Sequence, residues 1–202
     1  VIENLMEAIG TEEEGRTLAL GRELVAYVVA ADLINLPANE DEDEVFRAWL
    51  REVLTKRLDG STLQLTHEER PNNWGTHAGA SRAAVALYLQ DDEELERTAV
   101  VFKGYLGDRS AYDDFIFGDL HWQADPDTPV GVNPPGATKE GHSIDGALPE
   151  EMRRGGDFRW PPAETGYPWE ALQGALVQAE ILCRAGYPTW EWEDEALLRA
   201  AE

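Results

Sequence analysis

Several stretches of the chain have apolar residues that recur every three or four positions, the spacing that places them on one face of an α-helix. This pattern predicts helices over residues 16–35, 43–58, 74–90, 92–106, 168–185 and 194–201. In the second of these, the inner stripe consists of Phe46, Trp49, Leu50 and Val53. No pair of segments has the strict alternation and tight turn of a convincing β-hairpin. The predicted fold class is therefore all-α.

Two long stretches lack helical periodicity. Residues 61–72 are predicted to form a loop, and His67 is expected to be a loop residue. Residues 108–165 are rich in Gly, Pro, Asp and aromatic residues and are predicted to be mostly irregular. Because irregular segments of this length in a compact domain are usually functional or mobile, we expect a long active-site loop region here.

The predicted helix over residues 74–90 is rich in Ala and Gly, and small side chains let helices approach closely. Short connections between the helices favour antiparallel helical hairpins, the layout of an α/α array. With 202 residues, the chain is expected to form one domain spanning residues 1–202. It begins with Val1, so we expect a fragment, a processed chain or a trimmed one, such as the C-terminal part of a larger assembly of helices.

Acidic residues outnumber basic ones by 40 to 17, which gives a net charge of −23. This balance argues against a nucleic-acid partner, because such proteins normally present a basic face. It would also slow the encounter with a polyanion. No apolar run approaches the roughly 20 residues that span a bilayer, so no membrane partner is expected. Cys183 is the single cysteine and is expected to belong to the core.

Three motifs stand out along the chain. Asn72 and Asn73 form a pair before a predicted helix, Leu148–Arg154 reads LPEEMRR, and Tyr167 opens the sequence YPWEAL at the start of another helix. Together, over roughly residues 70–185, they resemble the pattern of the alginate lyase superfamily. That resemblance implies an incomplete (α/α) toroid and a polysaccharide lyase that cleaves a uronic-acid polymer, alginate-like or glucuronan-like, by β-elimination. It also implies no cofactor, an anionic polysaccharide as partner, and a secreted or periplasmic location.

The resemblance also implies roles for individual residues. Asn73 and Arg154 are expected to neutralise the substrate carboxylate, because amide and guanidinium groups hydrogen-bond a carboxylate. Tyr167 is expected to protonate the leaving oxygen and is also able to act as the base. His142, in a loop with Gly141 before it, is the first candidate among the histidines for acid–base chemistry. His121 and His77 remain alternatives.

A second set of residues is expected to bind the sugar chain. Asn72 lies beside the neutralising Asn73, although Asn is also a favoured helix N-cap. Tryptophan rings offer flat apolar faces to sugar rings, while core packing is the ordinary role of each. The predicted substrate-binding set is Asn72, Trp74, His77, His121, Trp122 and Trp169.

Two other functions stay open at this point. Asp113, Asp114, Asp119 and Asp125 contain carboxylates that an α/α glycoside hydrolase would need. A non-catalytic carbohydrate-binding domain is the other alternative, because Trp74 stands where the superfamily has a histidine. No Cys/His spacing typical of a metal site is present, so we predict no metal. The sequence makes no prediction about oligomeric state.

Overall fold

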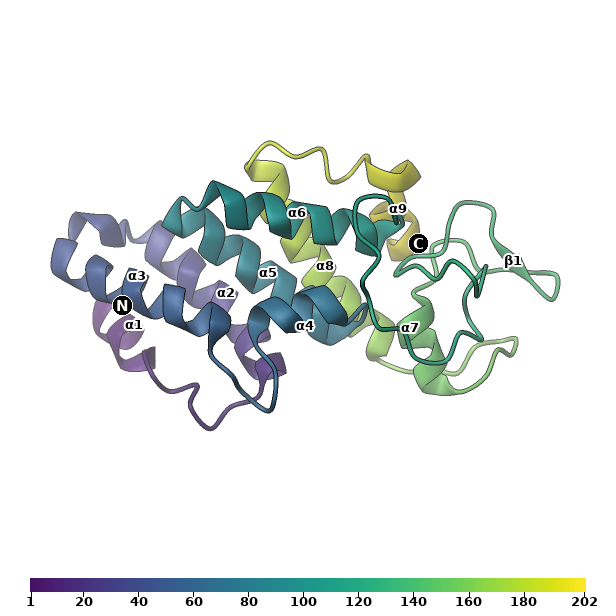
Figure 1. The fold of residues 1–202 in the computed structure, drawn as a ribbon, viewed down its shortest axis with the longest axis horizontal. Helices are drawn as coiled ribbons and strands as arrows, with labels where there is room; N and C mark the ends of the chain where they lie inside the picture. The colour runs from purple at the N-terminus through teal and green to yellow at the C-terminus, as the bar shows by residue number, and fades with distance from the viewer.

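The computed structural model describes residues 1–202 and is mainly helical, with 58% of residues in helices (Figure 1). The α-helices are α1 (Ile2–Ala8), α2 (Thr17–Leu33), α3 (Glu40–Thr55), α4 (Leu63–Glu69), α5 (Asn73–Leu89), α6 (Asp92–Leu106), α7 (Pro149–Met152), α8 (Tyr167–Arg184) and α9 (Trp192–Ala201). Two 3₁₀ turns, η1 (Leu36–Ala38) and η2 (Arg153–Gly155), and two short strands, β1 (Thr138–Lys139) and β2 (His142–Ser143), complete the list. The all-α prediction is confirmed. The toroid stays a prediction.

Helix α5 lies at the centre, packed between α2 and α8 and also against α4 and α6. It is buried on almost every side, which its small residues make possible. A Cβ atom at Gly79 would fall within 3 Å of the His67 ring, so only glycine fits this helix contact. At Gly174 of α8, a Cβ atom would lie 2.6 Å from the backbone nitrogen of His77. The predicted close approach of helices is thus confirmed at named positions.

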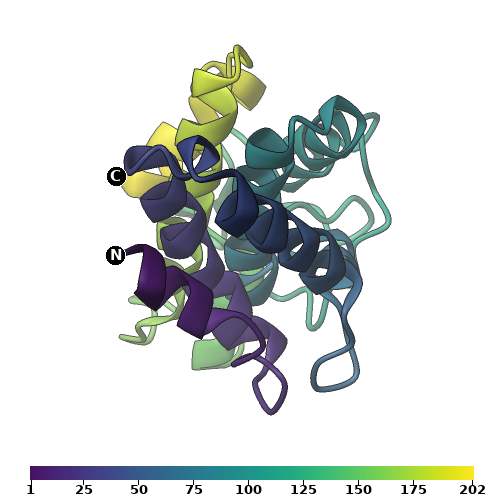
Figure 2. The ribbon, with the colours of Figure 1, turned by 90° about the vertical axis from the view of Figure 1, so that its left-hand side faces the viewer.

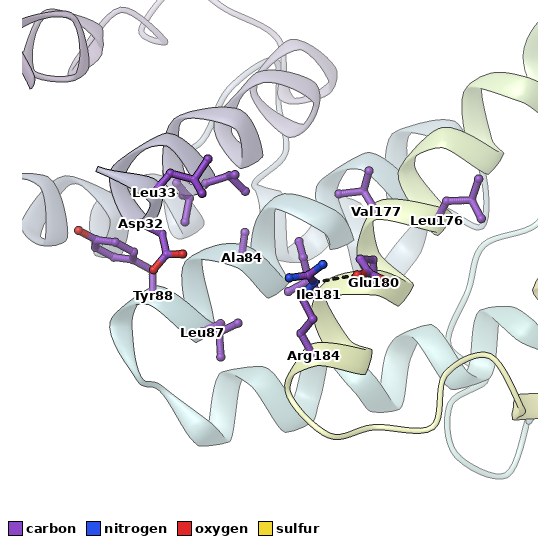
Figure 3. Close-up of a pocket in the computed structure, with 12 residues that line it drawn as sticks. Asp32, Leu33, Ala84, Leu87, Tyr88, Leu176, Val177, Glu180, Ile181 and Arg184 are labelled. Carbon is purple, nitrogen blue, oxygen red and sulfur yellow. Dashed lines mark hydrogen bonds and ion pairs between the residues drawn. The ribbon is translucent and has the colours of Figure 1, made fainter. Parts of the chain in front are cut away.

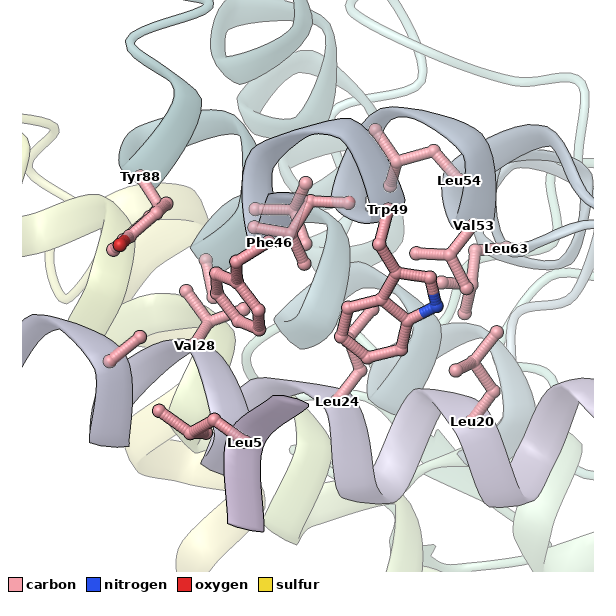
Figure 4. Close-up of a cluster of buried hydrophobic side chains, with 14 of the residues drawn as sticks. Leu5, Leu20, Leu24, Val28, Phe46, Trp49, Val53, Leu54, Leu63 and Tyr88 are labelled. Carbon is pink, nitrogen blue, oxygen red and sulfur yellow. The ribbon is translucent and has the colours of Figure 1, made fainter. Parts of the chain in front are cut away.

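Two apolar clusters stabilise the helices. The first joins α1, α2, α3 and α5, with Phe46 and Trp49 of α3 packed over Leu24 and Val28 of α2 (Figure 4). In it, the Tyr88 hydroxyl donates to a carboxylate oxygen of Asp43 at 2.5 Å. The second joins α5, α6, α8 and α9. The view turned by 90° shows α1 and α3 lying in front of the other helices at one end of the molecule (Figure 2).

The prediction of a loop over residues 61–72 is wrong, because α4 occupies Leu63–Glu69. Thr62 caps this helix, its side-chain oxygen accepting the Leu65 N–H at 3.0 Å. Leu63, Thr66 and His67 are all buried, so the inner face includes two polar residues. A hydrophobic pattern therefore missed the helix, and His67 is a buried core residue rather than a loop residue.

The other predicted helices are present, and their ends differ from the predicted ones by a few residues. The largest shift is in α3, which begins at Glu40 because the acidic residues 40–43 form its first turn, where the helix dipole favours negative charge. Residues 108–165 are mostly irregular, as predicted, and lie together at one end of the molecule (Figure 1). They include a minimal antiparallel hairpin, in which β1 pairs with β2, that the sequence did not reveal. None of the helices is long and apolar enough to cross a bilayer.

Candidate active site

The first wall of the candidate site is the N-terminus of α5. Asn72 is the N-cap, and its side-chain oxygen accepts the Trp74 N–H at 3.0 Å. Asn73 is the first residue inside the helix and is only 6% exposed. Its backbone N–H, one of the groups that a helix start leaves without an internal partner, is donated to the side chain of Glu151. Asn72 thus takes the capping role that is the ordinary one for its residue type.

The second wall is the short segment that contains α7 and η2. Its two neighbouring glutamates are buried and reach in different directions. Glu151 accepts the Asn73 N–H, whereas Glu150 accepts the Gly118 N–H at 3.0 Å and pairs with Arg153. Arg154 follows in η2, three residues after Glu151. The Glu151–Asn73 contact therefore joins two chain segments that are 78 residues apart.

Tyr167 forms the third wall as the first residue of α8, with Pro168 directly after it. Proline suits this position because the first helical turn does not need its N–H. The Tyr167 side chain is 36% exposed, and the Arg154 guanidinium carbon lies 4.5 Å from the centre of its ring. A cation over the face of an aromatic ring is attracted by its quadrupole. The Arg154 and Tyr167 side chains therefore hold one another at the rim of the cleft.

These walls enclose an open pocket of about 400 Å³. Its lining residues come from α2, α5, η2 and α8, and they are Leu18, Arg22, Asn73, Trp74, Arg154, Gly166, Tyr167 and Glu170. We call Asn73, Trp74, Arg154 and Tyr167 the pocket group. Three of the four residues predicted to be catalytic, Asn73, Arg154 and Tyr167, thus meet at one concave surface.

The pocket is locally richer in positive charge than the chain as a whole. Arg22 and Arg154 line it beside a single carboxylate, that of Glu170, and Arg22 is ion-paired with Glu170. Arg70 lies over the Trp74 ring, its guanidinium carbon 4.6 Å from the centre. An anionic ligand that enters this pocket would meet the Arg154 guanidinium and the Asn73 amide, in spite of the net charge of −23.

Two titratable side chains lie behind the pocket. Burial raises the pKa of Glu151 to about 7, although the Asn73 N–H and the nearby Arg154 oppose that rise. Burial also lowers the pKa of His77 to about 4, and the positive charge of Arg22 adds to the effect. His77 lies four residues after Asn73, is buried, and has no hydrogen-bond partner at its Nε2 atom. It does not line the pocket.

Three predicted site residues, His121, Trp122 and His142, instead make contacts with the segment between η2 and α8, where His142 meets Trp160. We call His121, Trp122, His142 and Trp160 the loop group. His121 Nδ1 lies 2.6 Å from an Asp157 carboxylate oxygen, and the Trp122 indole donates to the Gly156 carbonyl at 3.0 Å. The His142 ring stacks on Trp160, with 4.7 Å between ring centres and 8° between planes. These contacts hold the segment between η2 and α8, and none of the four residues lines the pocket.

Other predicted positions also lie outside the pocket. Trp169 is 63% exposed on α8, two residues after Tyr167, and lines no part of it. The structure adds Leu18, Arg22, Gly166 and Glu170, which sequence reasoning did not select. Arg22 is the one basic residue of α2, a largely apolar helix, and this was the one available signal. The Arg22 guanidinium is partly exposed to solvent and is ion-paired with Glu170, so its charge is satisfied in both ways.

A larger apolar groove of about 610 Å³ lies between α2, α5 and α8 (Figure 3). Exposed Val29, Leu33, Leu87 and Val177 line it, and its charged residues are Asp32, Glu180 and Arg184. The last two are hydrogen-bonded to each other at 2.7 Å. The groove has no side-chain amide, and its one guanidinium, that of Arg184, is already paired with Glu180. The smaller pocket is therefore the better candidate for chemistry.

Comparison with known protein families gives one match, to the alginate lyase model, over residues 14–114. This is half of the chain, and it spans α2 to α6. The chain belongs to the alginate lyase family. The resemblance inferred from the motifs is therefore confirmed, and membership of this family indicates a polysaccharide lyase. No curated protein and no solved structure matches the chain.

The alginate lyase match includes Asn72, Asn73 and Trp74 but ends before Arg154 and Tyr167. The family assignment thus depends on the helical part of the molecule. Arg154 and Tyr167, the two pocket-group residues outside the match, line the same pocket as Asn73. Their functional roles belong to the proposal below.

Proposed function

We propose that this alginate lyase family member cleaves a uronic-acid polymer by β-elimination in the pocket formed by α2, α5, η2 and α8. The observation on which this depends is that Asn73, Arg154 and Tyr167 line one pocket. They supply an amide, a guanidinium and a phenol, which match the needs of the reaction. A uronate must have its carboxylate neutralised, lose its C5 proton and receive a proton at the departing O4 atom.

Neutralisation is assigned to Asn73 and Arg154. When the C5–H bond breaks, negative charge spreads onto the uronate carboxylate, and fixed donors stabilise that charge. Asn73 is almost fully buried at the start of α5, and the Arg154 guanidinium lies over the Tyr167 ring. Donors that are already in place need no reorganisation when the charge develops.

Proton transfer is assigned to Tyr167. Among the pocket residues it is the one proton-transfer group that is not in an ion pair, because Glu170 is paired with Arg22. Acting as phenolate, Tyr167 takes the C5 proton, and the electrons of that bond form the C4=C5 double bond. The C4–O4 bond then breaks, and Tyr167 returns the proton to O4. The products are a new non-reducing end with the double bond and an ordinary reducing end.

The glycoside hydrolase alternative finds less support. That reaction needs two carboxyl groups flanking the scissile bond. The pocket has one carboxylate, Glu170, and Arg22 already neutralises it. Asp113, Asp114, Asp119 and Asp125 do not line the pocket.

The finer predictions from the sequence analysis are kept as proposals. We propose an anionic polysaccharide, alginate-like or glucuronan-like, as substrate, a reaction without a cofactor, a secreted or periplasmic location, and one lyase-like domain over residues 1–202. The choice of Tyr167 over His142 as the acid–base group is a revision, since His142 stacks on Trp160 away from the pocket.

The deciding experiment is incubation with a panel of polyuronates that includes polymannuronate, polyguluronate and glucuronan. A lyase produces an unsaturated uronate that absorbs in the ultraviolet, together with new reducing ends. A hydrolase produces reducing ends without that absorbance, and a binding domain produces neither. Reducing ends without ultraviolet absorbance, or polymer binding without any product, would overturn the proposal.

A further inference from the structure

Glu151 is a buried carboxylate that the proposed reaction does not use. It is 1% exposed, so it cannot touch a polymer in the cleft. Its Oε1 atom accepts the backbone N–H of Asn73, and it precedes Arg154 by three residues in the same short segment. Glu151 therefore bonds one of the two residues to which neutralisation of the substrate is assigned and belongs to the same short segment as the other.

We propose that Glu151 is a positioning residue. By holding the backbone N–H of Asn73, it fixes the side-chain amide of Asn73 relative to the Arg154 guanidinium. This inference rests on the proposed lyase function. The start of α5 and the α7–η2 segment come from distant parts of the chain, and the Glu151–Asn73 bond links them directly. A carboxylate that accepts an N–H at a helix start is favoured by the helix dipole and makes a stronger bond than a neutral acceptor does.

The surroundings of Glu151 make this link sensitive to its ionisation. Charged and titratable groups around it are Arg153 and Arg154 of η2, Glu150 of α7 and Tyr105 of α6, while α5 contributes the neutral Asn73. Burial raises the pKa of Glu151 to about 7. Near neutral pH, a change of one unit therefore changes the fraction of molecules in which the Asn73 N–H meets a charged acceptor.

Glu150 provides a matched control. It is the neighbouring residue on α7, is also buried, and also accepts a backbone N–H, in its case that of Gly118. It is paired with Arg153 rather than with the pocket. Replacing Glu150 with Gln removes a buried carboxylate from the same helix without touching Asn73.

The kinetic test compares Glu151→Gln with Glu150→Gln on a polyuronate that the wild-type protein cleaves. Glutamine keeps the shape and an acceptor oxygen but removes the charge, so it resembles protonated Glu151. We expect Glu151→Gln to lower kcat by about 10-fold or more, as loss of a charge-assisted bond implies, with KM changed much less. The wild-type rate should fall on acidification through a midpoint near pH 7, and Glu151→Gln should lack that step. Glu150→Gln should keep it.

A second measurement, a pH titration followed by NMR, uses the wild-type protein and does not depend on catalytic activity. The amide resonance of Asn73 in the wild-type protein should shift with pH, with a midpoint near 7, because its acceptor is the titrating Glu151 carboxylate. An Asn73 amide that does not titrate would overturn the proposal even if the lyase assay succeeds. Glu151→Gln activity within twofold of wild type with the same pH profile would overturn it as well. If no polyuronate is cleaved but the Asn73 amide titrates, the lyase function fails and the Glu151–Asn73 link stands.

Discussion

The pocket group and the loop group both contain aromatic side chains yet are built differently. Asn73 and Tyr167 are each the first residue of a long helix, and Trp74 follows Asn73. The loop group lies in or next to irregular segments and makes its contacts there, such as the His142–Trp160 stack. Side chains at helix starts are fixed by the packing of the whole helix, whereas loop contacts fix only one another. We therefore propose chemistry for the first group and support of a loop for the second.

The largest effect is expected at Tyr167. Replacing it with Phe keeps the ring beneath Arg154 but removes the proton that the proposed reaction delivers to O4. Loss of a positioned acid costs roughly 10²–10⁴-fold in rate. Turnover of polyuronate should fall by that factor, while polymer affinity and folding remain near wild type. Turnover above about a tenth of wild type would remove Tyr167 from the mechanism and weaken the division into two groups.

The next effect distinguishes Asn73 from Asn72. Asn73→Ala should lower kcat by about 10²–10³-fold, the usual cost of losing one donor to a developing negative charge. Asn72→Ala should mainly lower stability, by about 1 kcal/mol, because it removes the helix cap. Steady-state kinetics and chemical denaturation of both variants check this. Equal kinetic losses at the two positions would show that Asn72 contacts the substrate too.

The buried carboxylate behind the pocket should appear in the pH dependence of stability. The folded-state pKa of Glu151 is raised to about 7 from 4.5, so between these values the unfolded state binds fewer protons than the folded state. Wild-type stability should therefore fall relative to Glu151→Gln as pH rises from about 4.5 to about 7. The full difference is about 3 kcal/mol. Denaturant unfolding of the two proteins at several pH values measures it, and a constant difference would contradict the buried titration.

The smallest effects are expected in the loop group. His121 and Asp157 form an exposed pair, and such pairs contribute between 0 and about 1 kcal/mol. His121→Ala and His142→Ala should each change turnover by less than about fivefold, which corresponds to about 1 kcal/mol. The same kinetic assay checks both. A loss at His142 as large as that at Tyr167 would mean that the loop closes on the substrate and that the two groups act as one site.

Sequence alone determined the long helices and the motifs. Helical periodicity located α2, α3, α5, α6 and α8, because an amphipathic or fully apolar helix must bury its inner face. The motifs around Asn73, Arg154 and Tyr167 indicated the alginate lyase family before any fold was known. Helical periodicity and short motifs are both local features, so each can be recognised within a short stretch of neighbouring residues.

Tertiary structure decided which residues share a surface. Periodicity did not reveal α4, because its buried face includes Thr66 and His67, whose burial depends on partners elsewhere, such as Gln178. Sequence neighbours ranked His142 first among the histidines, whereas the fold placed His121 and His142 in the region of residues 108–165, outside the pocket, and buried His67 and His77. Arg22 and Glu170 entered the pocket because α2 and α8 both pack against α5, which brings these two side chains into an ion pair. Long-range packing sets these relations, and no local pattern in the chain contains them.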